Sequence, residues 1–554
     1  MLKKPFCFIL ALAAFASALS GQSFLKNEGG TTNLYVDGKP FLVLSGELHN
    51  STSTSEAYME SIGVWDQMKS AHFNTVIASC SWDVIEPQEG RYDFSSVDHV
   101  ISNARKNGLK VVMIWFASWK NGESTYTPGY IKRNPKKYEL VMDEKGDYHN
   151  IISTFSKNTM NADAKAFAAL MRHIKAVDTD NTVIMMQVEN EMGVLNSVRD
   201  FSPAAQKAWK SQVPSDLMDY LKAHKGKLFP ELEKVWSENG YKTAGTWEEV
   251  FGRSHQKDWP EYPYYTEEIF QAYHYAKYTE VVTAAGKAEH NIPMYVNNWL
   301  RQPKMVIPGS FPSGSPEPEV LDIWRAAAPS VDLSAPDVYI NEYDWVLKEF
   351  TRSGNPLFIP ECRGDASKAL YAYGEYDALG FAPFGFDGPQ EGNFFGVLPE
   401  RFSELASCYG ILSEMTELVL KHRGSDTMRG LFVTKDDPHP FVAMGDYVIS
   451  AKAVKEGAQS GALVIRTSED EFYIVAINAE FSFYLKDPKT KGSAMTEVIE
   501  EGVFENGVWK PGRRLNGDEN KVIIKGIEAQ RVVLYKSPVP TIGLSLLDNF
   551  YKQL

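Results

Sequence analysis

Two glutamates far apart in the chain each follow an apolar run, at the point where a buried strand would leave the core. Residues 182–188 are apolar or β-branched apart from one glutamine, and the polar cluster that follows contains Glu191. Residues 356–360 form a shorter apolar run that ends on Glu361. Two strand-end carboxyl groups suit cleavage of a glycosidic bond, in which one protonates the leaving oxygen and the other attacks or activates water. The pattern predicts Glu191 as general acid/base and Glu361 as nucleophile.

These roles require different protonation states of the two glutamates. The acid must arrive protonated, so we expect a raised pKa at Glu191, whereas the nucleophile Glu361 must be ionised. Each glutamate taken alone would also suit a structural ion pair. A retaining mechanism holds the two carboxyl groups about 5–5.5 Å apart, and an inverting one about 6.5–9.5 Å apart.

The elements that would position these glutamates are strands that alternate with helical segments. Helical patterns occur at residues 64–71, 96–106 and from 161 onward. The predicted strands cover residues 41–49, 75–80, 109–116, 182–193, 294–298, 335–339, 356–361 and 379–386. This α/β alternation predicts a (β/α)8 TIM barrel, in which catalytic groups lie at the C-terminal ends of the parallel strands.

The 554 residues divide into unequal parts. Residues 1–20 have the basic, apolar and small-residue regions of a signal peptide. Residues 21–425 are the predicted catalytic barrel, with a long insertion at about 194–289 that we expect to wall the site or recognise an extended substrate. Residues 426–554 change to short apolar and alternating segments typical of a β-sandwich, which either binds carbohydrate or packs against the barrel as a structural module.

Composition argues against several classes of function. The formal net charge of −14 disfavours binding to nucleic acid or to anionic membranes. The three cysteines after the signal, Cys80, Cys362 and Cys408, are too few for a disulfide framework. We expect Cys362 to pack in the core, because alternation turns it away from the side that Glu361 faces. The sequence contains no metal-binding His or Cys spacing and no glycine-rich phosphate loop, so we expect neither metal nor cofactor.

The N-terminal apolar run also bears on location. It is shorter than the roughly 20 residues that a transmembrane anchor needs. We therefore expect an exported protein, periplasmic or secreted, without a membrane anchor once the signal is removed.

Polar and aromatic residues at strand ends are the candidate sugar contacts. We predict six of them: Asn190, Tyr339, Trp119, Trp299, Asn298 and Asp337. Asn190 would hold a sugar hydroxyl beside the acid, and Tyr339 would hydrogen-bond Glu361 and hold it ionised. Trp119 and Trp299 would form stacking platforms, with core packing as the alternative. For Trp82 and Phe386 core packing is the favoured interpretation.

Several motifs resemble one family of retaining barrel glycosidases, in a clan whose catalytic glutamates lie on strands four and seven. Besides Asn190, Glu191 and Glu361, the segments that are similar to glycoside hydrolase family 35, the β-galactosidases, are residues 41–47, 65–69, 73–76, 90–94 and 187–191, together with Trp82, Glu86 and Pro87. The resemblance covers most of the barrel. The C-terminal segment resembles a module attached to one bacterial branch of that family.

The resemblance implies a retaining exo-β-galactosidase that removes terminal β-D-galactose by double displacement, and the branch implies xyloglucan side chains as substrate. Residues 115–122 depart from the family, whose members have a Gly-Pro-Tyr and Ala-Glu segment that contacts galactose there. Because of this departure another retaining β-glycosidase, such as a β-glucosidase or an endo-glycanase, remains an alternative. A non-catalytic glycan-binding protein is the alternative from another class, and the presence of both glutamates argues against it.

Overall fold

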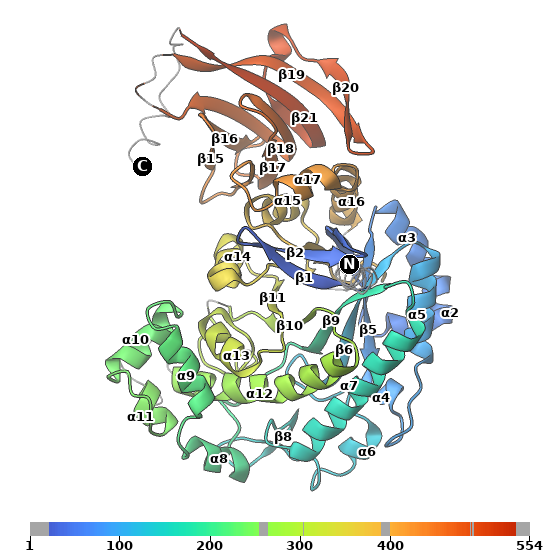
Figure 1. The fold of residues 1–554 in the computed structure, drawn as a ribbon, viewed down its shortest axis with the longest axis vertical. Helices are drawn as coiled ribbons and strands as arrows, with labels where there is room; N and C mark the ends of the chain where they lie inside the picture. The colour runs from blue at the N-terminus through green and yellow to red at the C-terminus, as the bar shows by residue number, and fades with distance from the viewer. Residues whose placement is uncertain are drawn as a thin grey trace, which may run out of the picture.

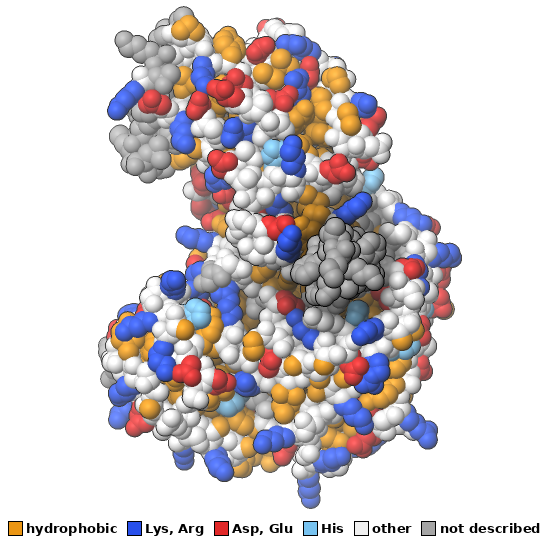
Figure 2. Space-filling model, in the orientation of Figure 1, with side chains coloured by type: hydrophobic (Ala, Val, Ile, Leu, Met, Phe, Trp, Pro, Cys, Tyr) orange, Lys and Arg blue, Asp and Glu red, His pale blue; other side chains and the backbone are white. Residues whose placement is uncertain are grey.

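The computed structural model describes residues 22–253, 264–302, 304–388, 399–487, 489 and 492–538. A parallel barrel and an antiparallel sheet domain lie end to end (Figure 1). The signal peptide expected at residues 1–20 lies outside the described residues. Acidic and basic side chains are interspersed over the face drawn in Figure 2.

The barrel consists of eight parallel strands that close on themselves, as predicted. In chain order the strands are β4 (Val43–Glu47), β5 (Thr75–Ser81), β6 (Lys110–Lys120), β9 (Val183–Asn190), β10 (Met294–Trp299), β11 (Leu333–Val338), β12 (Ile359–Cys362) and β13 (Gly380–Pro383). Every predicted barrel strand overlaps one of these.

Apolar side chains fill the barrel interior and close one of its ends. One buried cluster joins Val43, Ile77, Val112 and Ala382 from four barrel strands. The same cluster includes residues of β2 (Thr31–Val36), which forms a small antiparallel sheet with β1 (Phe24–Glu28) and β3 (Lys39–Pro40). The polar strand ends that carry the site are therefore at the opposite, C-terminal end.

Helices surround the barrel between its strands. Their bounds are α2 (Glu56–Ser61), α3 (Val64–Ser70), α4 (Trp82–Ile85), α5 (Ser95–Lys106), α6 (Gly129–Lys132), α7 (Lys157–Val177), α12 (Tyr265–Glu289), α13 (Leu321–Ala327), α14 (Tyr343–Thr351), α15 (Ala366–Glu375), α16 (Pro399–Glu414) and α17 (Thr416–His422). The helices predicted at residues 64–71 and 96–106 are present, and the one expected from residue 161 begins at Lys157. Within the described ranges no helix has both the length and the apolar character to cross a bilayer.

The expected insertion at residues 194–289 divides into two parts. Its first part carries the short helices α8 (Pro203–Trp209), α9 (Ser215–Ala223), α10 (Pro230–Glu238) and α11 (Trp247–Phe251). Its second part is α12, which packs along α7 and is an outer helix of the barrel itself. Only the four-helix part is therefore an addition to the barrel plan.

The C-terminal domain is one antiparallel sheet of eight strands. Its strands are β14 (Met428–Val433), β15 (Phe441–Met444), β16 (Tyr447–Ala453), β17 (Ser460–Arg466), β18 (Glu471–Leu485), β19 (Ser493–Glu505), β20 (Val508–Arg514) and β21 (Ile523–Ser537). The long strand β18 pairs with β17 through residues 472–477 and with β16 through residues 479–485. The expected sandwich is thus hydrogen-bonded as a single sheet around its own core.

The other face of this sheet packs against the barrel. Along β17, Ala462 and Val464 join the core of the sheet domain, whereas Leu463 and Ile465 join the cluster that includes the barrel helices. The backbones come closest at Gly461, where an added Cβ would lie 2.1 Å from the carbonyl oxygen of Ser367 in α15. This contact favours the structural module between the two roles considered for this domain.

This close contact predicts a measurable loss of stability. Gly461→Ala has no space for its methyl group, so we expect the free energy of unfolding to fall by about 1–3 kcal/mol, as in other overpacked sites. Thermal unfolding followed by circular dichroism measures the change. Lys452→Ala is the control, because it alters only a half-exposed ion pair with Glu480 on the same sheet. An unchanged midpoint for Gly461→Ala would show that α15 and the sheet leave room for the methyl group.

Candidate active site

Three carboxyl groups meet at the C-terminal end of the barrel. Glu191 follows β9, Asp337 lies in β11 and Glu361 lies in β12. Their nearest carboxylate oxygens lie within 4.8 Å of one another, and each residue is at most 6% exposed. Asp337 and Glu361 are also register partners in adjacent strands. The structure thus brings the two predicted glutamates together and adds the predicted Asp337 beside them.

The end of β9 departs from ordinary strand geometry. Glu189 and Glu191 have φ values of 63° and 43°, a left-handed conformation that is uncommon for residues other than glycine. Glu189 consequently leaves the pocket: its Oε2 accepts a hydrogen bond from the backbone of Trp119 (2.8 Å), and it faces Asp163 of α7. The next residues are then free to face the other carboxyl groups.

Glu361 is held on one side only. The Tyr339 hydroxyl donates a hydrogen bond to Glu361 Oε1 (2.7 Å), as the sequence predicts. The other oxygen, Oε2, is buried and has no hydrogen-bond partner within the described part of the chain. One oxygen is therefore fixed in orientation and the other remains available for reaction.

Glu191 is in an environment that favours its protonated form. Burial, and after it the charge of Glu361, raises the pKa of Glu191 to about 7, whereas the charge of Lys120 and a hydrogen bond with Asp337 act in the opposite direction. Burial and the charge of Glu361 also hold the pKa of Asp337 well above its usual range. A carboxyl group that titrates near neutrality suits a general acid.

Two charged residues of this site were not predicted. Glu47 ends β4 and is 2% exposed, and Lys120 ends β6 and is 8% exposed. Burial, followed by the charge of Glu361, raises the pKa of Glu47 well above the usual value. The pKa of Lys120 is also raised despite its burial, chiefly by the charge of Glu361. Glu47 carried a usable signal, since it is a carboxylate at the end of an apolar strand, as Glu361 is.

Asn190 links Lys120 to the acid. Its side-chain amide lies 3.2 Å from Lys120 Nζ and 3.2 Å from the backbone nitrogen of Glu191, and both are donors. The opposite amide orientation would accept from Gln187 and Asn297 but would place an NH2 group against the ammonium. We therefore assign the amide orientation from the charged donor Lys120, and place the Asn190 amide oxygen toward its ammonium group.

Trp119 is not a stacking platform, contrary to the prediction. Its side chain is fully buried, with its ring 4.7 Å and 4.5 Å from the rings of Tyr275 and Tyr278 in α12. Its indole nitrogen donates to the carbonyl oxygen of Ile152 (3.0 Å). The cause is a register shift between Trp115 and Lys120, where β6 pairs with β9. This irregularity turns the tryptophan to the helix layer.

Asn298 is likewise not joined to the carboxyl groups. The preceding residue, Asn297, accepts a hydrogen bond from the Glu191 backbone (3.0 Å) and donates to Asp337 Oδ2 (2.7 Å). Alternation along β10 turns Asn298 to the opposite side of the strand. Trp299 ends the same strand and is partly exposed, so it stays a candidate sugar contact.

The remaining predicted residues lie in the core. Trp82 is fully buried and its indole donates to Glu86 (2.8 Å). Phe386 stacks on Phe402, with ring centroids 6.0 Å apart. Cys362 is buried, and its thiol donates to the carbonyl oxygen of Ala382 (3.0 Å). These placements agree with the core packing favoured for all three.

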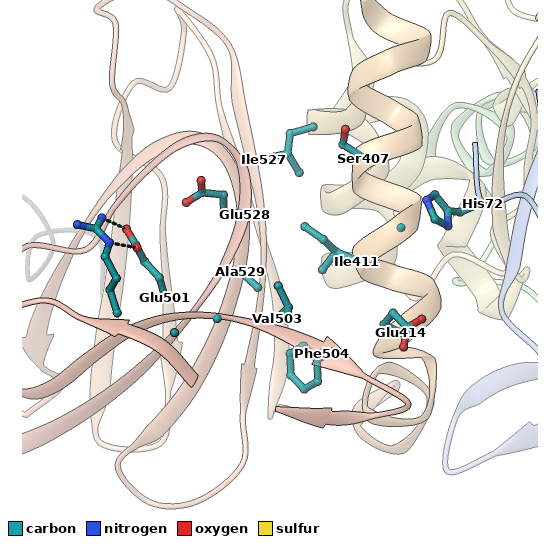
Figure 3. A pocket seen from close by; sticks show the side chains of 14 residues that line it. His72, Ser407, Ile411, Glu414, Glu501, Val503, Phe504, Ile527, Glu528 and Ala529 are labelled. Atoms are coloured by element: carbon teal, nitrogen blue, oxygen red, sulfur yellow. Dashed lines mark hydrogen bonds and ion pairs between the residues drawn. The ribbon is translucent and has the colours of Figure 1, made fainter. Parts of the chain in front are cut away.

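A cavity of about 680 Å³ lies away from this site, between α16 and the sheet domain (Figure 3). Ile411 and Glu414 line it from the helix, and Val503 and Phe504 from the sheet. Its one arginine, Arg513, is paired with Glu501, which also lines the cavity. Since the strand-end carboxyl groups lie at the barrel and not here, the candidate active site is the barrel end.

Comparison with known proteins supports a glycosidase-type barrel. Residues 58–278 match the sequence model of a β-galactosidase family, glycoside hydrolase family 42. The family 35 predicted from the sequence was therefore wrong, although β-galactosidase is the activity named for both families. Residues 405–525 match a domain of unknown function, DUF5597. The first match includes Lys120 and Glu191 and ends before Glu361.

Curated relatives match about a third of this chain or less. The chain is 26% identical to a β-galactosidase of Xanthomonas manihotis over 199 residues, which is 34% of this chain and 30% of that protein. It is 33% identical to β-galactosidase 11 of Arabidopsis thaliana over 117 residues, 19% of this chain and 14% of that protein. A catalytic mutant of a family 42 β-galactosidase from G. stearothermophilus has the same fold at 10% identity, with a TM-score of 0.50 over 89% of this chain and 98% of that one.

The mutual influence of the two glutamates can be tested by titration. Glu361→Gln removes the charge that, after burial, does most to raise the pKa of Glu191, so we expect that pKa to fall below about 7. Carboxyl ¹³C resonances of glutamate-labelled protein report the change. Glu60→Gln on the exposed face of α2 is the control and should leave the resonance unaltered. A pKa of Glu191 that does not fall in Glu361→Gln would contradict the coupling.

Proposed function

We propose that this protein is a retaining β-galactosidase. The observation that carries the proposal is the pair Glu191 and Glu361 on the fourth and seventh barrel strands, with carboxylate oxygens within 4.8 Å. Retaining glycosidases hold the two groups about 5–5.5 Å apart, and inverting ones leave about 6.5–9.5 Å for a water molecule. The family match and the relatives support galactose as the sugar.

The reaction proceeds in two displacements at the anomeric carbon. Glu361 attacks the sugar as Glu191 gives its proton to the glycosidic oxygen, so the bond to the aglycone breaks while a glycosyl ester forms. Esterified Glu361 has no charge, which removes an electrostatic cause of the raised pKa of Glu191. Glu191 then accepts a proton from water, which displaces Glu361 and releases the sugar with its original configuration.

We further propose that the enzyme is exo-acting and exported. It would remove terminal β-D-galactose from oligosaccharide or polysaccharide side chains, such as those of xyloglucan. The signal features of residues 1–20 support export to the periplasm or beyond.

Hydrolysis of an aryl β-D-galactoside tests the central proposal. We expect Glu361→Gln to lose on the order of 10³-fold or more in rate, and Glu191→Gln to lose roughly 10²–10⁴-fold on a poor leaving group. Circular dichroism checks folding, with Glu60→Gln as the matched control. Proton NMR should show β-galactose as the first product.

Other results would point to the alternatives. Activity on a glucoside but not on a galactoside would show that the enzyme is a β-glucosidase. Shortening of a polymer before release of monosaccharide would identify an endo-glycanase. Binding without hydrolysis of any aryl glycoside would identify a glycan-binding protein. First release of α-galactose would contradict retention.

The pH dependence of kcat/KM follows from the protonation of Glu191. Glu191 acts in the protonated form and its pKa is about 7, so kcat/KM should be largest below that pH and fall as the pH rises through it. Initial rates between about pH 5 and 9 measure this limb. An alkaline limb that is unchanged in Glu191→Gln would assign it to another group.

A further inference from the structure

Lys120 is a buried cation whose hydrogen-bonding capacity is largely unused. An ammonium has three donors, and the contact found for Lys120 Nζ is the Asn190 amide oxygen at 3.2 Å. Over the described ranges no carboxylate oxygen lies within 4.0 Å of it. The ammonium also lies over the ring of Phe116, 5.1 Å from its centroid.

Carboxyl groups from four strand ends nevertheless face this ammonium. They are Glu47 after β4, Glu191 after β9, Asp337 in β11 and Glu361 in β12. They act on Lys120 through their charges without forming an ion pair. The unused N–H groups of Lys120, which is 8% exposed, are therefore available to an acceptor in the pocket, such as a hydroxyl group of a substrate that displaces water.

We propose that Lys120 contacts the substrate directly, donating hydrogen bonds to hydroxyl groups of the sugar that Glu191 and Glu361 hold between them. It is then a specificity-determining residue of the glycone site, and this role rests on the proposed function. The sugar is neutral, because the charge of Glu361 already opposes the charge of Lys120.

Lys120→Met tests the contact, because it keeps the length of the side chain and removes the donors. Rates are measured on aryl β-D-galactoside and on its 2-, 3-, 4- and 6-deoxy analogues. In the wild-type protein, loss of the contacted hydroxyl should lower kcat/KM roughly 10- to 100-fold. In Lys120→Met, kcat/KM on the parent galactoside should fall by a similar factor. Removal of the contacted hydroxyl group from the substrate should then lower kcat/KM no further.

A matched control lies on the same strand. Lys110→Met is at the other end of β6, where Nζ binds Asp37 (2.8 Å), and it should behave as wild type on every substrate. Lys120→Met should also move the alkaline limb to higher pH, since the charge of Lys120 lowers the pKa of Glu191. The groups that face Glu191 from other strands, Glu361, Asp337 and Glu47, are unchanged in this variant.

Binding separates a failure of this inference from a failure of the proposed function. Calorimetric titration with galactose should show weaker binding to folded Lys120→Met than to wild type or Lys110→Met. Equal galactose affinity, or the same pattern of deoxy penalties in both proteins, would overturn the role of Lys120. A wild-type protein that hydrolyses no galactoside but binds galactose through Lys120 would contradict the proposed β-galactosidase activity and support the contact between Lys120 and the sugar.

Discussion

The candidate site depends on the difficulty of placing several like charges together in a dry environment. Glu47, Glu191, Asp337 and Glu361 converge at the strand ends, and burial makes their mutual repulsion expensive. Protons therefore stay on some of these groups near neutrality. Once one group is ionised it favours protonation of its neighbours, so an acid and a nucleophile arise from the same residue type.

A buried hydrogen-bond network behind the site keeps these carboxyl groups in place. The left-handed residues at the end of β9 turn Glu189 outward, where it meets the backbone of Trp119 and the carboxyl group of Asp163. Asp163 in turn accepts hydrogen bonds from Trp115 (2.9 Å) and Ser118 (2.6 Å). This buried connection joins β6, β9 and α7 directly behind Lys120 and Glu191, so both site residues share one support.

The sequence predicts what depends on local apolar pattern. All eight barrel strands, Glu191, Glu361 and the contact between Tyr339 and Glu361 follow from apolar runs that end in polar residues. Side-chain direction was predicted less well, because the register shift in β6 turns Trp119 to the helix layer and leaves Lys120, which was not predicted, at the site. The prediction was also wrong by one residue in β10, where Asn298 was expected at the site and Asn297 lies there. The charge balance of the pocket depends on contacts between distant strands, which no local pattern encodes.

The sheet face that packs on α15 has a consequence for how the molecule behaves as a whole. Leu463 and Ile465 belong to the same apolar cluster as the barrel helices, so the boundary between the domains is continuous core. A barrel expressed without the sheet would expose that surface to water, which favours self-association. We therefore expect the C-terminal domain to keep the barrel soluble, and the two domains to unfold together.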